Sequence, residues 1–169
     1  MSNPERSDSG TWYSRKTAAA LILLCAVLAA AFVYFHRSSH LVLINEETGE
    51  KIASYPMKPG DTFGVGFVHS VNKSPVTDWY EIRQDGIYVI RTVYYGFGAG
   101  VQTQLEEGQK LEYGEDGSMI ITGFDRRMDD LVYFVGTVSD HTLTLEGGEQ
   151  ISLRDLCGRN TKVRFRLEK

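Results

Sequence analysis

Hydrophobic positions divide this chain into two parts with different patterns. Residues 17–35 form one apolar run without a charged side chain, whereas from residue 40 onward short apolar runs alternate with turn residues. A helix over residues 17–35 would reach about 28 Å, which is close to the hydrocarbon thickness of a bilayer. The first pattern therefore predicts a transmembrane helix in contact with membrane lipid.

Basic residues flank the apolar run unequally. Arg15 and Lys16 precede it directly, and Arg37 alone follows it before Lys51. Cytoplasmic flanks of membrane helices are enriched in lysine and arginine. We therefore predict a single-pass protein of the cytoplasmic membrane, with its N-terminus in the cytoplasm and its C-terminal domain outside.

This topology divides the chain into three segments. We expect a disordered cytoplasmic tail over residues 1–14, an anchor with its flanks over residues 15–37 and an extracytoplasmic domain over residues 40–169. A cleaved signal peptide is the alternative, with small residues suited to cleavage around Ala29 and Ala31. An anchor is favoured because the run is longer than the apolar core of a signal peptide, which has about 7–15 residues.

The second part of the chain has the pattern of an all-β domain. Its apolar runs are rich in β-branched and aromatic residues, and Asp-Gly or Gly-Gly pairs typical of tight turns separate several of them. No helical period is long enough for a crossover between parallel strands, so we predict an antiparallel β-sandwich or a partly open barrel. Thr103–Gly108 and Ser152–Cys157 are each a candidate for one helical turn. The expected strands are Leu41–Asn45, Lys51–Tyr55, Thr62–Val71, Val76–Gln84, Ile87–Tyr95, Lys110–Tyr113, Ser118–Gly123, Leu131–Gly136, Thr142–Leu145, Glu149–Leu153 and Lys162–Leu167.

Charge and composition narrow the classes of partner. Residues 40–169 contain 14 of the 18 basic and 20 of the 22 acidic residues, which gives this part a net charge of −6. Such a balance disfavours nucleic acid as a partner. The histidines have no clear ligand spacing and Cys157 stands alone in this part of the chain, so we predict neither a metal site nor a cofactor.

The strongest candidate site lies in a predicted hairpin near the middle of the domain. If residues 72–75 form its turn, Val71 pairs with Val76, and His69 faces Asp78 across the two strands. An imidazole and a carboxylate would then meet at the rim of an apolar face. Such a pair is either a cross-strand contact that satisfies two half-buried groups or a recognition contact sensitive to pH.

The opposite face of the same hairpin carries Ser70, Trp79 and Glu81, because side chains alternate along a strand. Ser70 and His69 therefore point apart, which argues against a Ser-His-Asp triad. We predict no catalytic residue. The binding or docking candidates are His69, Ser70, Lys73, Asp78, Trp79, Glu81, Gly98 and Gly100.

The glycine-rich run that contains Gly98 and Gly100 does not have the features of a phosphate-binding loop. No Gly-Lys-Ser/Thr follows it, and the next residues include two acids and little helical pattern. The run predicts a turn or bulge that ends the strand Ile87–Tyr95.

Several short motifs occur in an order that resembles a known family. They are His69-Ser70-Val71, Pro75-Val76, Asp78-Trp79-Tyr80-Glu81 and Gly98-Ala99-Gly100. The chain from about residue 41 to its end resembles a bacterial family known as domain of unknown function eighteen-fifty. Its members are small exported or membrane-anchored proteins often encoded beside TRAP transporters of the TAXI type. The resemblance implies an accessory role, with a TAXI-type solute receptor or TRAP permease as partner, and supplies no catalytic residues.

These observations favour a membrane-anchored extracytoplasmic accessory or binding protein of the bacterial inner membrane over an enzyme. Two alternatives stay open. One is a small hydrolase-like extracytoplasmic enzyme that uses His69 and Asp78. The other is a solute-binding β-barrel whose mouth presents His69 and Lys73 to a small acidic solute.

Overall fold

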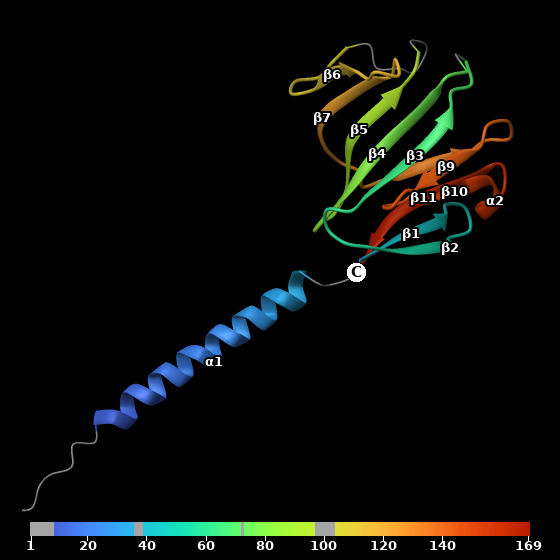
Figure 1. Cartoon of the computed structure of the whole chain (residues 1–169). Helices are drawn as coiled ribbons and strands as arrows, with labels where there is room; N and C mark the ends of the chain where they lie inside the picture. Colours follow the sequence, from blue (N-terminus) through green and yellow to red (C-terminus); the bar gives the residue numbers. More distant parts are fainter. Residues whose placement is uncertain (1–8, 36–38, 72, 97–103) are drawn as a thin grey trace, which may run out of the picture. The chain divides into compact units, whose positions relative to one another are not determined.

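The computed structural model describes residues 9–35, 39–71, 73–96 and 104–169. The chain divides into an N-terminal unit over residues 1–37 and a β-domain over residues 38–169 (Figure 1). Helix α1 spans Ser9–Phe35 and includes the predicted apolar run. The described residues contain no helix that is long and apolar enough to cross a membrane. The anchor and its topology therefore stay predictions.

The described part of the β-domain forms two antiparallel sheets. Sheet A has four strands in the order β2-β1-β11-β8, and sheet B has seven in the order β10-β9-β3-β4-β5-β7-β6. The antiparallel, sandwich-like all-β fold expected from the sequence is therefore confirmed. The elements are β1 (Ser39–Asn45), β2 (Lys51–Met57), β3 (Thr62–Val68), β4 (Pro75–Arg83), β5 (Gly86–Tyr94), β6 (Lys110–Tyr113), β7 (Met119–Arg127), β8 (Leu131–Val135), β9 (His141–Thr144), β10 (Gln150–Ser152), α2 (Leu153–Cys157) and β11 (Thr161–Glu168).

Alternating burial explains why these segments form strands. In β4, the buried residues Val76, Tyr80 and Ile82 alternate with partly exposed Thr77 and Trp79. One face of the strand thus enters the core while the other meets solvent. The same alternation underlies the sequence prediction, and each of the expected strands has a counterpart in the structure.

The short helix α2 follows β10 directly. Ser152 caps its N-terminus, because the Ser152 hydroxyl accepts a hydrogen bond from the Asp155 N–H at 3.0 Å. This helix confirms the helical turn expected at Ser152–Cys157. The other candidate turn, at residues 103–108, is not helical over its described residues 104–108.

The apolar core has two parts that differ in which sheets build them. The larger part joins the sheets and includes Leu41 and Phe165 from sheet A and Phe63 from sheet B. The buried residues of the smaller part all come from sheet B, and they are Val76, Tyr94, Met119 and Ile121. Figure 1 shows β1, β2 and β11 beside one end of the long strands β3, β4 and β5. Sheet A thus covers only part of the inner face of sheet B.

The hairpin between β3 and β4 departs from the predicted register. Val65 lies opposite Asp78, and Phe67 lies opposite Val76. The predicted pairing of His69 with Asp78, and of Val71 with Val76, is therefore wrong. The displacement is an even number of residues, so the strand side chains keep the faces that the sequence predicted for them.

The physical reason for this departure is a longer connection between the two strands. Strand β3 ends at Val68, and the His69 N–H donates to the Ser74 carbonyl at 2.9 Å. Within the loop the Lys73 N–H donates to the His69 carbonyl at 3.0 Å, and Lys73 adopts a left-handed φ of 56°. His69 therefore belongs to the loop and not to the strand.

A pair of glycine substitutions tests the packing of β7. Gly123 has a φ of 80°, and an added Cβ would lie 2.2 Å from the Gly108 carbonyl oxygen. Gly117 has the same φ of 80° with no atom within 4 Å of that position. We expect Gly123→Ala to lower the free energy of unfolding by about 3 kcal/mol or more, against about 1 kcal/mol for Gly117→Ala. Urea denaturation measures both, and equal losses would contradict this packing.

Candidate functional site

A cavity of about 400 Å³ lies where sheet A stops covering sheet B. Residues 131–133 of β8 form one wall, and strands β4, β5 and β7 form the floor. The apolar part of the floor includes residues of the smaller core, Val76, Tyr94 and Ile121. The polar lining residues are His69, Asp78, Tyr80, Thr92, Arg126, Asp130 and Tyr133. A cavity in which several polar side chains converge beside apolar surface is a candidate ligand site.

Four side chains form a continuous hydrogen-bonded chain along one side of the cavity. The Tyr133 hydroxyl donates to Asp78 Oδ2 at 2.8 Å, and the Thr92 hydroxyl donates to Asp78 Oδ1 at 2.8 Å. The hydroxyl oxygens of Tyr80 and Tyr133 lie 2.7 Å apart. Because Tyr133 gives its only hydroxyl proton to Asp78, Tyr80 must donate to Tyr133. Asp78 is thus held in one orientation by strands β5 and β8.

Burial keeps both tyrosines protonated. Desolvation raises the pKa of Tyr133 well above its ordinary value, and the negative charge of Asp78 raises it further. The pKa of Tyr80 is raised by the same two causes, desolvation first. Both phenols therefore remain hydrogen-bond donors throughout the physiological pH range.

Two charged side chains that line the cavity, Asp78 and Arg126, form no direct ion pair among the described residues. Among the described residues, no lysine, arginine or histidine forms an ion pair with Asp78. Arg126, exposed at the mouth, likewise has no ion-pair partner within the described part of the chain. Each Asp78 oxygen accepts one hydroxyl and retains capacity for a further donor. The cavity is therefore suited to a ligand group that donates hydrogen bonds.

His69 lines this cavity from the loop between β3 and β4. Its Nδ1 accepts a hydrogen bond from the Val71 N–H at 3.3 Å. Nδ1 therefore acts as a hydrogen-bond acceptor in this geometry. His69 and Asp78 thus share a cavity, as the sequence placed them on one face, but their hydrogen bonds go to other partners.

A second histidine, His141, packs against the Tyr133 ring. The ring of His141 stacks on Phe67 at a centroid distance of 5.2 Å and meets the edge of Tyr133 at 5.9 Å. Burial lowers the pKa of His141, which keeps its ring neutral at neutral pH. His141 therefore acts as an aromatic wall for Tyr133.

Trp79 and Glu81 lie on the outer face of sheet B, away from the cavity. Gly64 leaves room for the Trp79 ring, because a Cβ there would lie 3.2 Å from the indole, and the Arg91 guanidinium lies 4.9 Å from the ring centroid. Glu81 accepts from Arg83 at 2.8 Å. These two predicted site residues therefore do not join His69 and Asp78.

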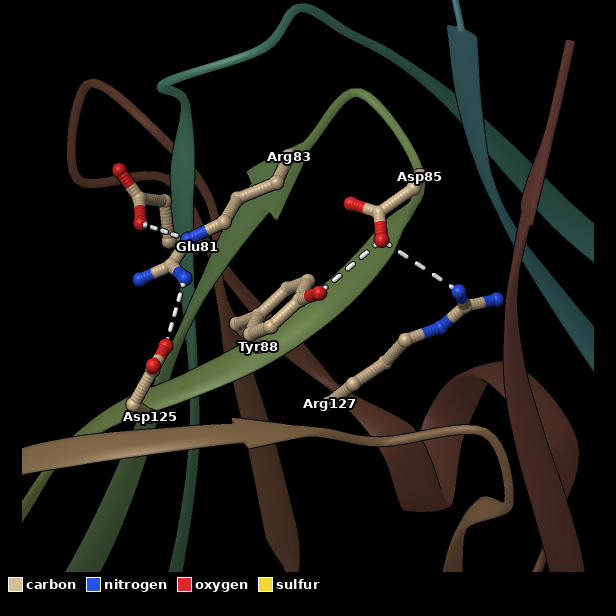
Figure 2. Close-up of polar contacts among 6 residues, drawn as sticks. All are labelled: Glu81, Arg83, Asp85, Tyr88, Asp125 and Arg127. Carbon is tan, nitrogen blue, oxygen red and sulfur yellow. Dashed lines mark hydrogen bonds and ion pairs between the residues drawn. The ribbon is translucent and has the colours of Figure 1, made fainter.

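An ion-pair network surrounds Glu81 on this outer face (Figure 2). Figure 2 shows Arg83 between Glu81 and Asp125, with nitrogen–oxygen distances of 2.8 and 2.9 Å. Asp85 accepts from the Tyr88 hydroxyl at 3.0 Å and pairs with Arg127 at 3.4 Å. Because Asp125 and Asp85 are largely exposed, the pairs contribute little stability. We therefore interpret this network as a solvent-exposed connection between β7 and the β4–β5 hairpin.

The other sequence candidates lie outside the cavity lining. Ser70 and Lys73 are exposed in the loop between β3 and β4. Gly98 and Gly100 fall outside the described residues. Lys73 is exposed and does not line the cavity. The alternative in which Lys73 binds a solute beside His69 therefore stays a prediction.

Sequence reasoning missed the residues that hold Asp78. Thr92 lies opposite Asp78 in the β4–β5 pairing, whereas Tyr133 lies in the other sheet, 55 positions away along the chain. One signal was present in the sequence, since Tyr133 occupies an inward position in an otherwise apolar strand. A buried tyrosine hydroxyl generally requires a hydrogen-bond partner.

No metal centre accompanies these groups within the part of the chain that the structure describes. That part holds no cluster of three or more histidine, cysteine, aspartate or glutamate side chains suited to a metal ion. The one described cysteine of the β-domain, Cys157, donates to the Leu153 carbonyl at 2.6 Å, and burial raises the pKa of its thiol. A thiol of this kind is unreactive.

Residues 63–153 match the family described as "Domain of unknown function (DUF1850)". The match covers more than half of the chain, and the chain belongs to this family. It extends from β3 to the start of α2 and so includes every polar residue that lines the cavity. A search of curated proteins gave no match, and a search of solved structures gave none.

Removing one hydroxyl tests the hydrogen-bonded chain. In Tyr133→Phe, Asp78 loses a donor and the buried Tyr80 hydroxyl loses its acceptor. We expect the free energy of unfolding to fall by about 1–3 kcal/mol. Tyr113→Phe, at a tyrosine that is 68% exposed, is the matched control and should leave it unchanged. Equal urea midpoints for the two variants would show that these side-chain hydrogen bonds do not stabilise the domain.

Proposed function

We propose that this protein is a membrane-anchored extracytoplasmic binding domain that serves as an accessory of a TAXI-type TRAP solute transporter. The observation that carries the binding role is the cavity in which hydroxyl donors fix Asp78, which has no ion-pair partner among the described residues. Groups that are held in place before a ligand arrives lose little entropy on binding. The partner is a TAXI-type solute receptor or a TRAP permease, as the family resemblance implies.

Binding is favoured over catalysis by the way in which the polar groups are engaged. In a hydrolase built on His69 and Asp78, the Asp78 carboxylate would have to accept a hydrogen bond from the His69 ring and orient it as a general base. Instead, Nδ1 of His69 faces the Val71 N–H, and both Asp78 oxygens face hydroxyl groups. The enzyme alternative would therefore need a rearrangement of the loop between β3 and β4.

The location of the domain is part of the proposal and rests on the sequence. The apolar run 17–35 would anchor the chain in the inner membrane, and Arg15 and Lys16 would keep the N-terminus in the cytoplasm. The β-domain would then lie on the side from which a solute receptor approaches its permease.

The binding role is tested with the full-length chain extracted in a mild detergent. We expect Asp78→Asn to reduce co-purification of the TAXI receptor or permease about tenfold, because the loss is one charge-assisted contact. His69→Gln should reduce it about twofold to fivefold. Asp125→Asn, which changes an exposed carboxylate of the outer face, is the control and should have no effect. Melting temperatures show whether each variant is folded.

Two outcomes would contradict this proposal. One is unchanged recovery of both transporter components with a folded Asp78→Asn variant. The other is turnover of a substrate by the purified protein that His69→Gln abolishes without loss of stability, which would move the function to the enzyme class.

Topology has its own test. Alkaline phosphatase fused to the C-terminus should be active, because the basic flank precedes the apolar run, and a cytoplasmic reporter at the same position should be silent. Protein isolated from membranes should also retain its original N-terminus. A chain that begins near Phe32 would instead identify a cleaved signal peptide.

A further inference from the structure

Strand β8 is an outer strand of sheet A, with β11 on one side only. Its sequence is Leu-Val-Tyr-Phe-Val, without a charge or a proline. Val132 is 37% exposed and Phe134 is 50% exposed. Proteins usually protect such an edge with charges, proline or a bulge, because unpaired main-chain groups bind other strands. β8 has no such protection, which is typical of an edge that a partner covers.

The register identifies which main-chain groups of β8 are free. The Glu46 N–H donates to the Lys162 carbonyl at 2.9 Å, so Lys162 directs its main-chain groups toward β1. Alternate residues of an antiparallel strand face opposite neighbours, so Val163 faces β8, where it lies opposite Tyr133. Val132 and Phe134 consequently direct their N–H and carbonyl groups away from β11.

The cavity runs along this edge. It is lined by three consecutive residues, Leu131, Val132 and Tyr133, although neighbouring side chains of a strand point to opposite faces. A cavity that touches all three therefore borders the edge of the strand as well as its inner face. Beyond the edge lies the part of sheet B that sheet A leaves uncovered.

We propose that β8 binds an extended segment of a partner protein as an additional strand of sheet A, with a lysine side chain of that segment in the cavity. The inference rests on the proposed binding function and names its mode. Main-chain hydrogen bonds to Val132 and Phe134 would hold the segment, and alternate side chains would point toward Asp78.

Charge complementarity selects lysine for the inward position. Asp78 is a fixed carboxylate with spare acceptor capacity and no ion-pair partner among the described residues. The domain as a whole carries a net charge of −6. Asp130, at the same wall, is already paired with Arg164. An ammonium group can donate to Asp78, and Arg126, which lines the same cavity, is exposed to solvent.

The probes are three fluorescent nine-residue peptides of alternating threonine and valine. They carry lysine, methionine or glutamate at the central inward position, and binding to the full-length protein in detergent is followed by fluorescence anisotropy. We expect the lysine peptide to bind at least about fivefold more tightly than the methionine peptide. Asp78→Asn should remove this preference. A stronger response to the glutamate peptide would overturn the choice of lysine.

Main-chain pairing is tested at the edge itself. Val132→Pro removes a main-chain N–H that faces the free edge. Val132→Thr keeps this N–H and has a side chain of similar shape. We expect the proline variant to bind the lysine peptide at least about fivefold more weakly than the threonine variant does. If Val132→Pro lowers the melting temperature strongly, Phe134→Pro, which removes the other free N–H, is measured in its place.

Three results would overturn strand addition. They are no binding of any peptide at millimolar concentration, equal affinity of the proline and threonine variants, and a wild-type dimer that Val132→Pro dissociates, since a second copy would then occupy the edge. If Asp78→Asn still reduces recovery of the transporter about tenfold while the peptides fail, the proposed function stands and only its mode falls. If Asp78→Asn leaves recovery intact, the proposed function itself falls.

Discussion

The hydrogen bond from Tyr133 to Asp78 is the interaction on which the cavity and its carboxylate depend. It joins the outer strand of one sheet to a central strand of the other, and it sets the orientation of the carboxylate. Burial keeps Tyr133 and its neighbour Tyr80 protonated, so the direction of each hydrogen bond is determined. If apolar side chains replaced these hydrogen-bonded residues, the two sheets would still pack, but the cavity between them would lose its polar wall.

The unequal size of the two sheets explains why a cavity exists at this place. Sheet A ends at β8 while the inner face of sheet B continues, and the smaller apolar core formed by Val76, Tyr94, Met119 and Ile121 belongs to sheet B alone. A step of this kind joins apolar surface, an unpaired strand edge and a carboxylate within one short distance. Those three features suit an extended partner segment better than a small isolated solute.

The two faces of sheet B differ in how their charged side chains are paired. The outer face carries exposed ion pairs around Arg83 and Arg127, which water and salt screen. The inner face carries Asp78 with hydroxyl partners and no ion pair among the described residues. The charges of the outer face are already paired, whereas the inner carboxylate, which has no ion pair among the described residues, is the group to which we assign the proposed recognition of a partner.

The sequence by itself determined the class of the fold, the approximate limits of the strands and the face on which each strand residue of the β3–β4 hairpin lies. These properties depend on local rules, namely the two-residue period of a strand and the conformations that turn residues permit. Only the tertiary structure decided which residues meet. His69 left the strand because hydrogen bonds to Ser74 and Lys73 closed a longer loop, and Asp78 found Tyr133 in the other sheet. Trp79 and Glu81, adjacent to the site in sequence, face away from it. Contacts between distant strands depend on how two sheets pack, and one-dimensional periodicity carries no information about that packing.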